Sequence, residues 1–209
     1  MKRGFMVFVF KANELLEKQL NEVEQWHLKT PESEHFEASD FSSLVSRQHY
    51  INFELWHQED MARDPDAPDS KIAAVKRAID VLNQRRNDMI EHMDQSLLDT
   101  LQNKNVLYNA EVEMNSETPG SIIDRLSINA LKIYHMDEEI QRPDVTDEHR
   151  KKCSGKLSVL QDQRDDLGKS LEKLLADLSN GKKRLKVYQQ MKMYNDENLN
   201  PVLYQKAKN

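Results

Sequence analysis

Residues 70–101 carry apolar side chains at the three- and four-residue spacing of an amphipathic α-helix along their whole length. The stripe runs through Ile72, Val75, Ile79, Leu82, Met93 and Leu97. A β-strand places every second residue on one face, so a strand could not gather this pattern on one side. The segment therefore predicts one long helix, and that helix needs partner helices of comparable length to cover its apolar face.

Four more segments show the same spacing, at about 11–28, 40–63, 119–136 and 146–178. Only five glycines and six prolines occur among 209 residues, a composition that favours long helices over strands and tight turns. We therefore expect an all-α fold, an antiparallel bundle of about five main helices. The segment that begins at Pro119 is apolar on two opposite sides, which is typical of a central helix.

The length predicts a single helical domain over residues 1–209. Residues 1–10 read as a disordered or over-long start. Residues 182–209 combine a basic run with several aromatic side chains, and we expect them to form an ordered tail that packs on the bundle.

The net charge of −6 argues against general binding of nucleic acid, which is a polyanion. Residues 150–192 are the basic part of the chain, and the run KKRLK at 182–186 is interpreted as a solvated face after a helix end. No stretch approaches the ~20 apolar residues of a membrane span, and Cys153 has no partner for an internal disulfide. These features favour a cytoplasmic protein.

Polar residues intrude on faces that should be apolar. In 40–63, Asn52 and Glu59 share the core face and Arg63 lies at its edge, and Arg86 lies within the stripe of 70–101. Buried polar groups are costly unless they are paired. One explanation is a structural network, with Glu59 paired to Arg63 and Asp124 paired to Arg86 or Arg125. The other is a polar pocket between helices, and both explanations stay open.

Two metal-binding patterns can be drawn from these residues. Glu91 and Asp94, with Glu59 or Asp60, would suit Mg²⁺ in a phosphohydrolase, and Arg63, Arg86 or Arg125 would hold its phosphate. A ferritin-type site would use Glu54-x-x-His57, but its counterpart His135-x-x-Glu138 has the reverse order. Glu54 and His57 also point away from the apolar stripe, so we do not favour the second pattern.

Four blocks of the chain together resemble one bacterial family, which is catalogued only as a domain of unknown function. The blocks are WHQED…RDP at 56–65, IDVLNQRRNDMIEHMD at 79–94, TPGSIIDRLSINALKIYHM at 118–136 and KVYQQMKMYNDENLNPVLY at 186–204. The resemblance implies no established activity. Genes of this type often lie near glycosyltransferase and lipopolysaccharide genes, which implies a connection with sugar or nucleotide-sugar metabolism.

The resemblance and the helical faces single out much the same residues. We expect a pocket for a small anionic metabolite, such as a phosphorylated sugar, a nucleotide or a nucleotide sugar. The residues expected to bind it are Asn52, Trp56, Glu59, Asp60, Arg63, Asn83, Arg86, Asn87, Asp124, Arg125 and Tyr194, with Glu91 and Asp94 as ligands if Mg²⁺ is the cofactor. The alternatives are a phosphohydrolase and a non-enzymatic accessory protein of a glycosyltransferase or lipopolysaccharide pathway. A homodimer face would explain the same polar surface.

Overall fold

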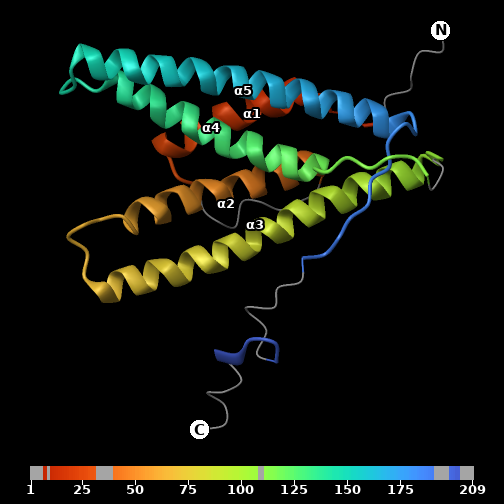
Figure 1. Cartoon of the computed structure of the whole chain (residues 1–209), viewed down its shortest axis with the longest axis horizontal. Coiled ribbons are helices and arrows are strands. Elements are labelled where there is room, and N and C mark those ends of the chain that lie inside the picture. Colours follow the sequence, from red (N-terminus) through yellow and green to blue (C-terminus); the bar gives the residue numbers. More distant parts are fainter. Residues whose placement is uncertain (1–6, 9, 32–39, 108–110, 191–197, 203–209) are drawn as a thin grey trace.

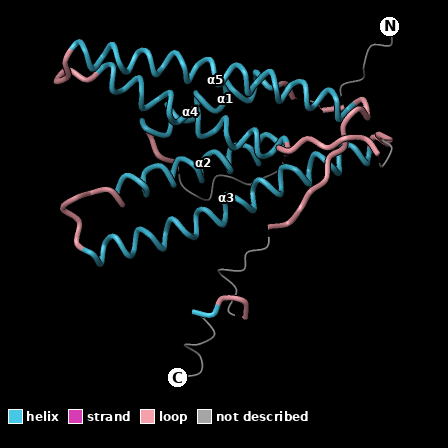
Figure 2. The backbone as a smooth tube through the Cα atoms, in the orientation of Figure 1, coloured by secondary structure: helices cyan, strands magenta, loops and turns pink. Residues whose placement is uncertain are grey.

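The computed structural model describes residues 7–8, 10–31, 40–107, 111–190 and 198–202, and within these it contains five α-helices and no strand (Figures 1 and 2). The helices are α1 (Ala12–Leu28), α2 (Phe41–Met61), α3 (Asp69–Asn103), α4 (Pro119–Gln141) and α5 (Asp147–Ser179). The prediction of an all-α bundle is confirmed. In the part of the chain that is described, no helix combines the length and the apolar composition needed to cross a bilayer.

The helix ends follow from local chemistry. Asp40 caps α2, since its carboxylate accepts a hydrogen bond from the Ser43 N–H at 2.8 Å. Thr118 caps α4 in the same way, accepting from the Ser121 N–H at 3.2 Å, and α4 then begins with a proline. After α5 the chain turns at Gly181, whose φ of 66° favours glycine.

Two antiparallel helix pairs make up the body of the bundle, α2 with α3 and α4 with α5 (Figure 1). Helix α4 packs against each of the other four helices, so the central place expected for it is confirmed. Helix α1 packs against α2, α4 and α5. The two pairs meet where α4 packs on α2 and α3.

Three groups of buried apolar side chains hold the helices together. The largest joins all five helices and includes Val45, Met93, Leu97, Ile123 and Leu171. A second lies between α2 and α3, around Ile51 and Ile79. The third is aromatic and joins α1, α2 and α4 through Trp26, Tyr50, Phe53, Ala130 and Leu131.

Both end segments contact the body close to the helices that they adjoin. Phe8 is buried in the largest core, and the ring of Phe10 stacks on Phe41 of α2 with centroids 4.5 Å apart. Part of the segment 1–10, expected to be disordered, therefore packs on the bundle. After α5, Leu185 is buried and the Arg184 N–H donates to the Glu113 carbonyl at 3.1 Å. Half of the expected C-terminal tail, residues 191–197 and 203–209, lies outside the described residues.

The contact between α3 and the first turn of α4 requires glycine at position 120. The Gly120 N–H donates to Asp94 Oδ1 at 2.7 Å, and a Cβ at this position would lie 2.8 Å from both Asp94 Oδ1 and the Ile90 carbonyl oxygen. We predict that Gly120→Ala lowers the free energy of unfolding by about 1–3 kcal/mol, measured by urea denaturation, because the helices must move apart.

Gly155→Ala is the matched control. Gly155 lies inside α5, and a Cβ there would meet no atom within 4 Å. The free energy of unfolding of this control should rise by up to about 1 kcal/mol, because alanine is the better helix former. Equal effects of the two substitutions would show that the contact at Gly120 is not tight.

Candidate functional site

The carboxylate of Asp124 is the meeting point of α2, α3 and α4. Its Oδ1 accepts hydrogen bonds from Gln48 Nε2 at 2.6 Å, Asn52 Nδ2 at 3.0 Å and Arg86 Nε at 2.7 Å. Its Oδ2 accepts a second bond from Arg86, through Nη2. Asp124 is only 4% exposed, so these donors replace the water that it loses on folding.

A directional chain of hydrogen bonds continues from this carboxylate toward α1. His49 Nε2 lies 2.9 Å from the Gln19 carbonyl oxygen, which can only accept, so this nitrogen carries the proton. His49 Nδ1 therefore accepts from the Ser127 hydroxyl at 2.6 Å, and Ser127 accepts from Asn52 Nδ2 at 2.9 Å. The buried polar residues Gln48, His49 and Asn52 of α2 thus each have a hydrogen-bond partner, although the Oε1 atom of Gln48 has none. This bonding supports the structural explanation for them.

A cavity of about 310 Å³ opens beside this network. Seven of the residues expected to bind a ligand line it. They come from α2, from the turn that follows it and from α3: Asn52, Trp56, Glu59, Asp60, Arg63, Asn83 and Arg86. Leu55 of α2 and Ile128 and Leu131 of α4 form its apolar wall. The structure brings these seven polar and aromatic side chains together around one cavity. The binding of a ligand there stays a prediction.

The charged groups of the cavity are partly neutralised by each other. Arg63 pairs with Glu59, with Nη1 2.8 Å from Oε2, and both side chains are exposed. Arg86 is half-buried, and its hydrogen bonds to Asp124 raise the pKa of its guanidinium above the usual value. Asp124 engages Nε and Nη2 of Arg86, so the same guanidinium still offers Nη1 to another partner.

Four of the expected ligand-binding residues do not line the cavity. Asp124 lies behind it and acts through Arg86 and Asn52. Arg125 points to the surface, where its Nη1 pairs with Glu117 at 2.8 Å. Asn87 is half-buried on α3 outside the cavity lining, and Tyr194 lies outside the described residues.

Glu91 and Asp94, the expected Mg²⁺ ligands, have separate partners. Glu91 accepts a hydrogen bond from the Gln190 N–H at 2.8 Å, whereas Asp94 accepts from Gly120 at the start of α4. Burial raises the pKa of Asp94 to about 6, although its bonds to Thr118 and Gly120 act in the opposite direction. The positive end of α4 also favours this carboxylate. The contacts give Asp94 a structural role, and the geometry does not favour a shared metal.

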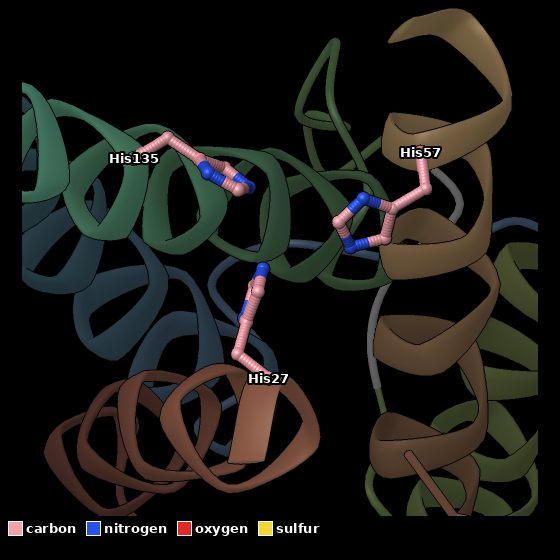
Figure 3. Close-up of side chains that lie close together, drawn as sticks. All are labelled: His27, His57 and His135. Carbon is pink, nitrogen blue, oxygen red and sulfur yellow. The ribbon is translucent and has the colours of Figure 1, made fainter. Parts of the chain in front are cut away.

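The structure also assembles a histidine cluster that the sequence analysis did not anticipate. His27 of α1, His57 of α2 and His135 of α4 place ring nitrogens within 4.8 Å of one another (Figure 3). Among the described residues, no other group of three or more histidine, cysteine or acidic side chains has the spacing of metal ligands. The sequence pairs His57 with Glu54 and His135 with Glu138 as metal ligands, because no pattern within one helix shows which histidines from three helices will meet.

Comparison with known proteins gives a family but no activity. A family model described as "Protein of unknown function (DUF4254)" matches residues 42–187, and the chain belongs to this family. The match begins in α2, as the resemblance implied, and ends just after the start of the fourth block of that resemblance. No curated protein and no solved structure matches the chain.

The pair formed by Arg86 and Asp124 should contribute strongly to stability. We predict that Arg86→Met costs about 3–5 kcal/mol of unfolding free energy, because it leaves a buried carboxylate without its cation. Adding Asp124→Asn should recover part of this loss, with a coupling of about 1–3 kcal/mol in a double-mutant cycle measured by chemical denaturation.

The exposed pair of Arg125 and Glu117 provides the control, and Arg125→Met should change stability by less than about 0.5 kcal/mol. Additive effects of Arg86→Met and Asp124→Asn would contradict the account of Asp124 as the meeting point.

Buried His49 should make the protein sensitive to acid. Burial lowers the pKa of His49 to about 4, against 6.5 for an unperturbed histidine. Between these values the unfolded chain binds a proton that the folded chain does not, so stability is complete above pH about 6.5 and falls as the pH decreases toward 4. We predict a loss of roughly 3 kcal/mol from this group over that interval, measured by urea denaturation at a series of pH values.

The comparison for this prediction is His49→Gln, whose amide can still donate to the Gln19 carbonyl. The variant should start less stable near neutral pH but lose less stability than the parent on acidification. Identical pH profiles would show that His49 does not stay neutral in the folded protein.

Proposed function

We propose that this DUF4254 protein binds a small polar metabolite with an anionic group, of the size of a phosphorylated sugar, in the cavity between α2, α3 and α4. The observation that carries the proposal is the fixed guanidinium of Arg86. Asp124 holds it by two nitrogens, and the side chain lines a cavity that also contains Arg63. An arginine already held in place loses little side-chain entropy when it binds an anion.

The rest of the lining suits the other end of such a molecule. Asn83 and Asp60 offer amide and carboxylate oxygens for hydroxyl groups, while Trp56 and Leu131 offer apolar surface for a sugar ring. Because Glu59 and Asp60 also line the cavity, a ligand that carries only negative groups would be repelled. A molecule with one phosphate and several hydroxyls matches both sets of residues.

Size distinguishes among the ligands that the sequence suggested. A cavity of about 310 Å³ lies at the lower end of ligand sites in proteins. This volume favours a sugar monophosphate over a complete nucleotide sugar. It fits the link to sugar metabolism that the family resemblance implied, and the proposal keeps the cytoplasmic location that the sequence favours.

We propose that the protein binds this metabolite and does not hydrolyse it. A Mg²⁺-dependent phosphohydrolase would need Glu91 and Asp94 to face a common ion, and each carboxylate is engaged with a different backbone N–H. A purely structural role for the polar residues is the remaining alternative. It accounts for Asp124 and its donors and for the pair of Arg63 with Glu59, but not for Asn83, which lines the cavity and is not among those donors.

Thermal unfolding of the full chain with hexose and pentose monophosphates, nucleoside monophosphates and the matching unphosphorylated sugars tests the proposal. A sugar monophosphate at about 100 times its Kd should stabilise the protein by about 2.7 kcal/mol by mass action, and the unphosphorylated sugar should have a smaller effect. Absence of a response to any phosphorylated sugar would contradict the proposal.

Variants then assign the response to the cavity. Arg63→Gln and Asn83→Ala should each reduce the ligand-induced shift with little change in the ligand-free melting temperature, because both side chains lie outside the buried network. Arg77→Gln removes an exposed arginine of α3 outside the cavity and should respond like the parent. Equal shifts in all three variants would place the ligand elsewhere.

A further inference from the structure

We propose that His27, His57 and His135 form a binding site for a zinc-class transition-metal ion. Each histidine comes from a different helix, and one ring nitrogen of each lies within 4.8 Å of those of the other two. Figure 3 shows the three rings directed into the same space between α1, α2 and α4. The site is independent of the proposed function, because none of the three histidines lines the cavity described above.

In two of the rings, hydrogen bonding at Nδ1 leaves Nε2 free to bind a metal ion. His27 Nδ1 lies 2.7 Å from the Val23 carbonyl oxygen, and His135 Nδ1 lies 2.7 Å from Glu138 Oε2. Both of these oxygens accept, so each Nδ1 carries the proton and each Nε2 carries a lone pair. A ring N–H bonded to a carbonyl or a carboxylate is the usual outer contact of a metal-binding histidine.

The free nitrogens are buried and have no hydrogen-bond partner. This holds for Nε2 of both His27 and His135. Buried His49 shows the ordinary alternative, since both of its ring nitrogens are hydrogen-bonded. A buried nitrogen without a partner costs free energy, and a metal ion between the rings would satisfy both nitrogens at once.

The rings are held by aromatic contacts before any ion binds. His27 stacks on Tyr134 with centroids 4.1 Å apart, and His135 stacks on Trp56 at 4.7 Å. His57 packs edge-on against Phe53 at 4.5 Å. Aromatic packing explains where the rings lie, but it does not explain why the unpartnered nitrogens of different helices face one another. Preorganised ligands favour metal binding because little order is lost.

The electrostatics also favour the neutral form that binds metal. Burial lowers the pKa of His57, and the rings of His27 and His135 lower it further, while Asp60 and Glu138 act in the opposite direction. The neutral imidazole is the form that can donate a lone pair to a metal ion. The two nearby carboxylates partly balance the charge of a divalent ion.

The donor set selects the class of metal. Imidazole suits Zn²⁺, Cu²⁺, Ni²⁺ and Fe²⁺, whereas Mg²⁺ and Ca²⁺ prefer oxygen. Zn–N bonds of about 2.0–2.1 Å in a tetrahedron place the nitrogens roughly 3.4 Å apart, which small ring rotations can reach from the present spacing. Three histidines leave the fourth position of a tetrahedral ion to water or another ligand.

Metal titration of the tag-free full chain, after treatment with a chelator, tests the site. We expect one equivalent of Zn²⁺ to bind by calorimetry, and one equivalent of Co²⁺ to give the visible absorption of a four-coordinate ion. Binding should weaken at least tenfold between about pH 7.5 and pH 5.5, because protons compete for the same nitrogens. A parent protein that binds no Co²⁺ or Zn²⁺ would overturn the proposal without any variant.

Variants locate the ion. His27→Gln, His57→Gln and His135→Gln should each weaken Zn²⁺ binding by at least about tenfold, and Glu138→Gln should weaken it about tenfold through the ring of His135. His92→Gln removes an exposed histidine of α3 and should bind as the parent does. Circular dichroism checks that each variant folds, and unchanged affinity in any two folded cluster variants would overturn the assignment.

Discussion

The buried carboxylate of Asp124 is the interaction on which the rest of the structure depends. It receives donors from α2 and α3 while it belongs to α4, so it joins the two helix pairs at one point. Apolar packing between helices tolerates small shifts, whereas a carboxylate with several short hydrogen bonds accepts few alternative positions. These hydrogen bonds therefore fix the position of α4 along its axis relative to α2 and α3.

One face of α4 connects this contact to both proposed sites. Asp124, Ile128, Leu131 and His135 follow at spacings of four, three and four residues, so they lie along one side of the helix. The first positions Arg86, the next two line the cavity, and the last belongs to the histidine cluster. Trp56 lines the cavity and stacks on His135, so both sites contact the same indole ring.

The sequence predicted what depends on neighbours along one helix. The five helices follow from apolar periodicity and capping residues. The polar residues on the core face of α2 stand out because Asn52 interrupts an apolar face. Sequence could not decide whether Asp124 pairs with Arg86 or Arg125, since that depends on how α3 and α4 meet. It also gave no sign of His27, whose partners lie on two other helices and become neighbours only through the crossing of α1 with α2 and α4.

Solvent exchange of the arginine Nε–H groups, followed by NMR, tests the central role of Asp124 most directly. The half-buried Arg86 donates its Nε–H to Asp124, whereas Arg63 and Arg125 are in exposed ion pairs. We expect the Arg86 signal to exchange slowly in the parent and rapidly in Asp124→Asn. Rapid exchange of Arg86 Nε–H in the folded parent would contradict the central role of Asp124.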